Sequence, residues 1–173
     1  MAAVAQSPWS PLFLMSSTCE NVAAFFAPVD PAGAGVRMAL NNKGVTDTAF
    51  ADDPGVQDAI SVLEGAGLDP FNGSVSTGVL FAQTTEYALR EAAAMEGGLT
   101  RTNLMKAVWN MDFVHPLLRD GVDIITDGVN DAYIIEGAVI AEYVPPTEEG
   151  SLGSFSDLSD LISVEGETGS FAG

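Results

Sequence analysis

Apolar and polar positions along the chain predict an alternating order of strands and helices. "PLFLMSS" (11–17) is a short apolar run that ends in small polar residues. This pattern is typical of a buried strand that delivers a loop to the carboxyl edge of a parallel sheet. "TCENVAAFFAP" predicts a short helix that is capped by Ser17 or Thr18 and stopped by Pro28. "AGVRMAL" (34–40) predicts a second strand after a turn-rich segment.

Three helices are predicted in the middle of the chain. "DDPGVQDAISVLEGAG" predicts a helix capped by Asp52 or Asp53, with Pro54 in its first turn and Gly65 and Gly67 at its end. Its inward positions are Val56, Ile60 and Leu63.

The second helix, "VSTGVLFAQTTEYALREAAAMEGG", is apolar on most sides, so we expect it to be wedged between other elements. Its narrow polar stripe holds Gln83, Glu86 and Arg90, and the last two are spaced for an ion pair. "LTRTNLMKAVWNMDF" predicts a third helix that is capped by Thr100. Its expected inward residues are Leu104, Met105, Val108 and Trp109.

The C-terminal part returns to strand patterns. "GVDIIT" and "AYIIEGAVIAEY" predict strands that are separated by the turn "TDGVND", and "FSDLSDLISV" predicts a final short element in a looser tail. The whole order, strand, helix, strand, three helices and strands, predicts an α/β fold with parallel sheets flanked by helices.

Composition narrows the classes of partner. The 173 residues are enough for one ordinary domain, and 24 acidic against 6 basic side chains give a net charge of −18. That charge excludes nucleic acid and argues against an anionic membrane surface. Its simplest interpretation is solubility; a specific cation-binding role is the alternative.

Targeting signals are weak in the sequence. The N-terminal apolar patch has no basic segment, and Pro8 and Pro11 interrupt it, so a signal peptide is not evident. No apolar run approaches the roughly 20 residues of a membrane span, and we expect no direct membrane insertion.

The acidic stretch 120–143 does not match the spacing of a calcium-binding loop. An EF-hand loop requires oxygen ligands at positions 1, 3 and 5, and a start at Asp123 or Asp127 puts Ile125 or Val129 at position 3. The acids also alternate with apolar residues instead of converging on one point. We therefore expect no metal site and no cofactor, and interpret the carboxylates as turn residues and a solvated face.

Catalytic motifs are missing from the sequence. A hydrolase would have to use the single cysteine, Cys19, or the single histidine, His115, but no G-x-S-x-G, Walker A, G-x-G-x-x-G or H-E-x-x-H motif is present. A lone cysteine at a helix start is usually a packing residue. We expect a protein that is not an enzyme.

The loop "MSSTCEN" suits a carboxylate or another polar small molecule, because it offers hydroxyls, backbone N–H groups and a helix N-terminus. Four longer segments carry a resemblance at the family level. They are "WSPLFLMSSTCENVAAFFAPV", "DDPGVQDAISVLEGAGLDPFNGSVSTGVLFAQTTEYALREA", "GGLTRTNLMKAVWNMDF" and "HPLLRDGVDIITDGVNDAYIIEGAVIAEY". In this order they resemble the later half of the type I periplasmic binding proteins, in the branch of leucine/isoleucine/valine-binding-protein-like substrate-binding components of ABC transporters.

The resemblance implies a partial two-lobed fold over residues 1–165, followed by a loose tail at 166–173. Residues 1 to about 30 would belong to the C-terminal lobe, the stretch to about 120 to the N-terminal lobe, and the last strands to the hinge. By this resemblance, the residues match only the later half of the family fold. If the chain begins at Met1, we expect weak or no ligand binding and self-association through exposed apolar edges.

The resemblance also implies a site and partners. The ligand-contacting loop of the family matches Ser16, Ser17, Thr18 and Cys19. A related amino-acid binder has an acidic residue there, and this chain offers Thr18, or Glu20 in a shifted register. Capping of the helix is the alternative role of this loop.

The implied function is capture of a small polar solute, such as an amino acid, as the extracytoplasmic component of an ABC transporter. ABC transporter permease subunits would be its partners, and its location would be periplasmic or cell-surface. The alternative is a stand-alone, non-catalytic sensing or interaction domain of the same fold.

Overall fold

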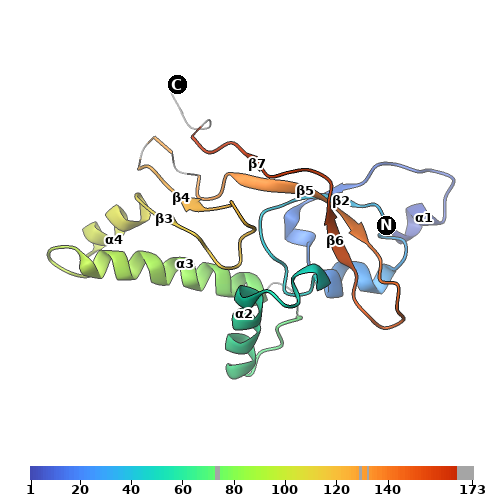
Figure 1. The fold of residues 1–173 in the computed structure, drawn as a ribbon, viewed down its shortest axis with the longest axis horizontal. Helices are drawn as coiled ribbons and strands as arrows, with labels where there is room; N and C mark the ends of the chain where they lie inside the picture. Colours follow the sequence, from blue (N-terminus) through green and yellow to red (C-terminus); the bar gives the residue numbers. More distant parts are fainter. Residues whose placement is uncertain (73–74, 129, 132, 167–173) are drawn as a thin grey trace.

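The chain folds as a mixed α/β structure, which Figure 1 shows for the computed structural model; residues 1–72, 75–128, 130–131 and 133–166 are described. The α-helices are α1 (Ala2–Ala5), α2 (Pro54–Gly65), α3 (Val75–Ala94) and α4 (Arg101–Val108). The strands are β1 (Leu14–Met15), β2 (Arg37–Leu40), β3 (Asp112–Phe113), β4 (Ile124–Ile125), β5 (Gly137–Val144), β6 (Ser154–Asp157) and β7 (Ile162–Ser163). Of the predicted loose tail 166–173, all but Gly166 lies outside the described residues.

The main sheet has mixed strand directions, so the predicted parallel sheet is wrong for most of it. β1 pairs in parallel with β2, whereas β2 pairs antiparallel with β5. β6 and β7 both pair antiparallel with β5, and β3 and β4 form a separate antiparallel pair. The antiparallel pairs arise because β5, in which alternate residues are buried, lies between β2 and β6 and runs opposite to both.

The predicted start of α2 and α4 is confirmed. Asp53 caps α2 by accepting from the N–H groups of Gly55 and Val56, with Pro54 as the first helical residue. Thr100 caps α4 by accepting from the N–H of Asn103. The predicted ion pair of α3 is also present, since Arg90 Nε lies 2.8 Å from a carboxylate oxygen of Glu86.

Other local predictions are wrong. Segment 18–28 is not one helix but a 3₁₀ turn η1 (Ser17–Cys19), a π-helical turn η2 (Val22–Phe26) and a 3₁₀ turn η3 (Ala27–Val29). A further 3₁₀ turn, η4 (Thr48–Phe50), precedes α2.

The predicted orientation of α3 and α4 also needs correction. α3 is not wedged on all sides, because Phe81 is 65% exposed. In α4 the buried residues are Asn103 and Ala107. Of the predicted inward residues only Leu104 is partly buried, whereas Met105, Val108 and Trp109, which directly follows the helix, are exposed. The short helix buries the stripe that packs against α3, and Asn103 turns inward because its amide donates to two loop carbonyls.

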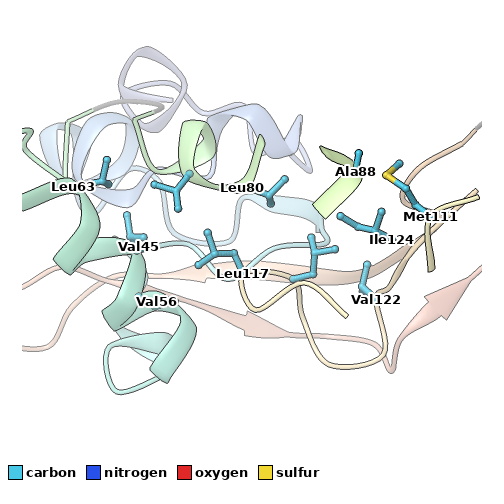
Figure 2. Packing of buried hydrophobic residues seen from close by; sticks show 12 residues of the cluster. Val45, Val56, Leu63, Leu80, Ala88, Met111, Leu117, Val122 and Ile124 are labelled. Atoms are coloured by element: carbon cyan, nitrogen blue, oxygen red, sulfur yellow. The ribbon is translucent and has the colours of Figure 1, made fainter. Parts of the chain in front are cut away.

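Two separate clusters of buried apolar residues hold the fold. The helical core is shown in Figure 2; its members are Val45, Val56, Ala59, Leu63, Val79, Leu80, Ala88, Met111, Leu117, Leu118, Val122 and Ile124. The sheet core consists of Val22, Phe26, Val36, Met38, Leu40, Val139, Ala141, Tyr143 and Phe155. The helical core comes from one continuous stretch, 45–124, and the sheet core comes from segments before and after it. The chain therefore passes between the two cores through 41–44 and again through 125–138.

Figure 1 shows the same division in space: α3, α4, β3 and β4 lie at one end, and β2, β6 and α1 lie at the other. The two parts are tied by polar contacts of buried groups. The Thr46 hydroxyl accepts from Val22 N at 2.8 Å, and the buried Asp47 carboxylate accepts from Phe155 N at 3.3 Å. These bonds position the segment 41–47 against both cores.

Candidate functional site

A pocket lies where segments from the two cores meet, at the carboxyl ends of the parallel strands β1 and β2. It encloses about 220 Å³ and is called the junction pocket below. Its lining residues are Ser17, Thr18, Glu20, Asn21, Asn41, Asn42, Gly44, Val45, Thr46, Ser76, Thr77, Leu80, Phe81 and Ile135. Pockets for drug-sized ligands measure roughly 300–1,000 Å³, so this one suits a solute of metabolite size.

Only two of the four predicted site residues line the junction pocket, and the other two have structural roles. Ser17 and Thr18 line the junction pocket, as a loop at a carboxyl strand end is expected to do. Ser16 caps the 3₁₀ turn instead: its hydroxyl accepts from Thr18 N at 3.4 Å and from the Thr18 hydroxyl at 3.0 Å. Cys19 packs against the sheet core. The predicted cap at Ser17 or Thr18 is therefore wrong, because Ser16 caps η1 and Asn21 caps η2.

Glu20 is the one ionisable side chain among the described residues that line the pocket. Burial raises the pKa of its carboxyl to about 7, and the nearby Asp47 carboxylate acts in the same direction. A hydrogen bond from the Asn42 amide and the Arg119 guanidinium oppose the rise in pKa without cancelling it. The pocket wall therefore holds a carboxyl group that changes charge near neutral pH.

Sequence reasoning missed the far wall of the pocket. Asn41 and Asn42 follow β2, and Ser76 and Thr77 come from the first turn of α3. The asparagine pair directly after a predicted strand was an available signal, because polar loops at strand ends gather at one sheet edge. Ser76 and Thr77 gave no such signal, since only tertiary packing brings α3 to that edge.

Arg119 and Asp47 form a buried polar layer behind Glu20. The guanidinium of Arg119 donates to the Asn42 carbonyl at 3.3 Å and lies over the Phe50 ring, 4.9 Å from its centroid. Burial raises the pKa of Asp47, although two backbone N–H groups and Arg119 stabilise its charged form. This layer holds in place the segment 41–47, which forms part of the pocket wall.

A larger groove of about 800 Å³ lies beside this layer but offers weaker chemistry for a ligand. It is more open, and it is lined by Lys43, Phe50, Asp53, Arg119, Asp120, Val139, Asp157, Leu158, Ser159, Asp160 and Leu161. Its two cations are engaged within the protein: Lys43 pairs with Asp53 and Asp120, and Arg119 pairs with Asp157. We therefore take the junction pocket as the candidate site.

The positions of the acidic side chains in the stretch 120–143 agree only in part with the prediction of a solvated face. Asp120 is an exposed partner of Lys43, which fits a solvated face. Asp131, Glu136 and Glu165, however, bring carboxylate oxygens within 4.8 Å of one another, so these acids converge. Burial and the adjacent Asp131 carboxyl raise the pKa of Glu136. Three clustered carboxylates also occur without a metal, and they remain a structural feature here.

His115 and Cys19 contact different parts of the protein. His115 is 1% exposed, its Nδ1 accepts from Leu117 N at 3.0 Å, and burial lowers its pKa. Its ring lies near that of Phe113, which packs on the helical core, whereas Cys19 packs on the sheet core. The geometry provides no nucleophile–base pair among these two residues.

Comparisons of the chain with models of known protein families, with curated proteins and with solved structures find no match. Among the described residues, no helix combines the length and the apolar character that crossing a membrane requires.

Proposed function

We propose that the chain binds a small polar solute in the junction pocket, as the extracytoplasmic substrate-binding component of an ABC transporter does. The observation that carries the proposal is the composition of the pocket wall. Ser17, Thr18 and Glu20 come from the β1 side, and Thr46, Ser76 and Thr77 come from the segments of the helical core. A solute in this pocket would contact both parts of the molecule at once.

The arrangement of the chain supports the same proposal. The two cores are linked by two crossing segments, as in a protein that binds its ligand between two lobes. Part of the predicted ligand loop, Ser17 and Thr18, faces the pocket. Open α/β sheets generally bind ligands at carboxyl strand ends, which is where this pocket lies.

The lining favours one class of solute. Glu20 and several hydroxyl and amide groups suit a donor such as an ammonium group, and no cation lies among the described lining residues. Val45, Leu80, Phe81 and Ile135 add an apolar wall. A small amine or amino acid with an aliphatic side chain fits both features. The alternative, a stand-alone sensing domain of the same fold, uses the same pocket and differs in its downstream partner.

Isothermal titration calorimetry with three matched probes tests the proposal. L-leucine carries an ammonium, a carboxylate and an aliphatic chain; isoamylamine lacks the carboxylate, and isocaproate lacks the amine. Residues of this chain line both sides of the pocket, so we expect binding of L-leucine and isoamylamine in place of the weak or absent binding that the resemblance implies. Isocaproate is not expected to bind, because Glu20 complements a cation. Binding of isocaproate alone, or of none of the three probes, would contradict the proposal.

Variants link the binding to the pocket. Thr18→Val removes a lining hydroxyl, and Thr102→Val removes an exposed hydroxyl of α4 as the matched control. We expect weaker binding, by about 5- to 10-fold, for the first variant and unchanged binding for the second. Equal affinities of the two variants would place the solute elsewhere.

A further inference from the structure

The contact between Glu20 and Asn42 joins the two sides of the junction pocket. Glu20 follows the 3₁₀ turn after β1, and Asn42 lies on the crossing segment after β2. The Asn42 amide donates a hydrogen bond to Glu20 Oε1, and both residues line the pocket. Asn42 is itself fixed, because its backbone pairs with Leu118 and its carbonyl accepts from Arg119.

The charged groups that face Glu20 come from two other elements. Asp47, at the start of η4, disfavours the ionised carboxylate, and Arg119 favours it. Arg119 is largely neutralised by its two contacts with Asp157. The balance leaves burial as the dominant influence, so the pKa of Glu20 is about 7 and the carboxyl is half protonated near neutral pH.

We propose that the proton on Glu20 gates solute capture in the junction pocket, and that Asn42 is the positioning residue that sets the pH of this gate. The inference rests on the proposed function and concerns the regulation of the same site. A protonated Glu20 has no charge to offer an ammonium group. Binding of a cationic solute to that form therefore releases one proton to solvent and leaves a carboxylate that accepts from the ammonium.

Asn42 acts through Glu20. Its amide donates to the carboxyl oxygen and so favours the ionised form. Removing the amide shifts ionisation of Glu20 to higher pH. The pH range in which the gate opens then moves upward, whether or not Asn42 touches the solute.

The first test measures the affinity of isoamylamine between pH 5.5 and 8.5, where an alkylammonium keeps its charge. A gate with a pKa of about 7 predicts binding about 30-fold tighter at pH 8.5 than at pH 5.5. Glu20→Gln removes the titrating group, so its residual binding is expected to be weak and independent of pH. Tight binding of isoamylamine by the wild type with no pH dependence would overturn the gate while leaving the proposed function intact. Absence of binding at every pH would contradict the proposed function, and with it the gate.

The second test needs no solute. Carbon-13 NMR of the Glu20 carboxyl is expected to show a midpoint near pH 7 in the wild type and a higher midpoint in Asn42→Ala. Asn110→Ala, which removes an exposed amide of the segment after α4, serves as the control with an unchanged midpoint. A wild-type midpoint near 4.5, the ordinary value for glutamate, would overturn the gate even if Asn42→Ala does not fold.

Discussion

Arg119 Nη1 lies 2.7 Å and 2.9 Å from the two carboxylate oxygens of Asp157. Arg119 follows the helical-core residues Leu117 and Leu118, and Asp157 ends β6 of the main sheet. The pair therefore connects the two parts of the molecule that also form the junction pocket. Arg119 is 7% exposed, so its guanidinium is held in a largely buried position.

Loss of Arg119 is expected to destabilise the protein strongly. Arg119→Met keeps much of the packing on Phe50 but leaves Asp47 and Glu20 without the nearby positive charge. We expect the free energy of unfolding to fall by about 3 kcal/mol in urea denaturation at pH 7. Asp157→Asn is the milder partner variant, with a loss of about 1 kcal/mol, because Asp157 is partly exposed. Equal losses for both variants would contradict the buried role of Arg119.

The cap of α2 provides a second prediction with a matched pair of variants. Asp53 accepts from two N–H groups of the first turn and also pairs with Lys43 at 2.9 Å. Asp53→Asn keeps a capping oxygen and loses the ion pair, whereas Asp53→Ala loses both. We expect Asp53→Ala to cost about 1 kcal/mol more than Asp53→Asn in thermal denaturation. An equal cost would show that the cap does not contribute.

Four carboxyl groups with raised pKa values are expected to make the fold more stable at mildly acidic pH than at pH 8. The pKa values of Glu20, Asp47, Glu136 and Glu165 are raised in the folded state. Each such carboxyl binds a proton more tightly when folded, so stability is gained as pH falls from about 8 towards the ordinary pKa values of the acids. We expect the melting temperature to be higher at pH 5.5 than at pH 8.

Two groups act in the opposite direction. Burial lowers the pKa of His115, so the neutral imidazole contributes to the free energy of unfolding above pH 6.5. This contribution is lost as the pH falls below that value. Lys43 lowers the pKa of Asp53, so the ionised Asp53 carboxylate stabilises the folded protein at neutral pH. That stabilisation is lost only below about pH 4. Glu20→Gln is expected to raise stability at pH 8 and to flatten the pH profile above pH 6. A wild-type melting temperature that falls from pH 8 to pH 5.5 would contradict this balance.

Self-association through exposed apolar edges remains a prediction from the sequence, and β1 is such an edge in the structure. Within the described part of the chain, β1 pairs only with β2, and Leu14 is 72% exposed beside Leu12 at 61%. An exposed apolar edge strand favours pairing between copies, and the net charge of −18 opposes it. We expect sedimentation velocity to show more association in high salt, and less for Leu14→Lys. A monomer under all salt conditions would contradict the prediction.

The sequence predicted local elements better than their arrangement. Caps at Asp53 and Thr100 and the spacing of Glu86 and Arg90 are local signals, and the structure confirms them. Strand direction was wrong because pairing of β2 with β5 joins residues about a hundred positions apart. No periodicity in either strand encodes that partner.

The candidate site was predictable only where its residues carry a local sequence signal. Ser17 and Thr18 lie on a loop that follows a strand, which is a local pattern. The sequence places Glu20 at the site only in a shifted register, and the raised pKa of its carboxyl depends on burial by distant segments. Ser76 and Thr77 reach the pocket through packing of α3, which the sequence does not specify.

Amide chemical-shift mapping with isoamylamine at pH 8.5 locates a bound solute residue by residue. If the solute binds in the junction pocket, saturable shifts are expected for Ser17, Thr18, Asn42 and Thr77, on both sides of the pocket, with little change in α4. Shifts confined to the larger groove around Lys43 and Asp160, or no saturable shifts at all, would show that the solute does not bind in the junction pocket.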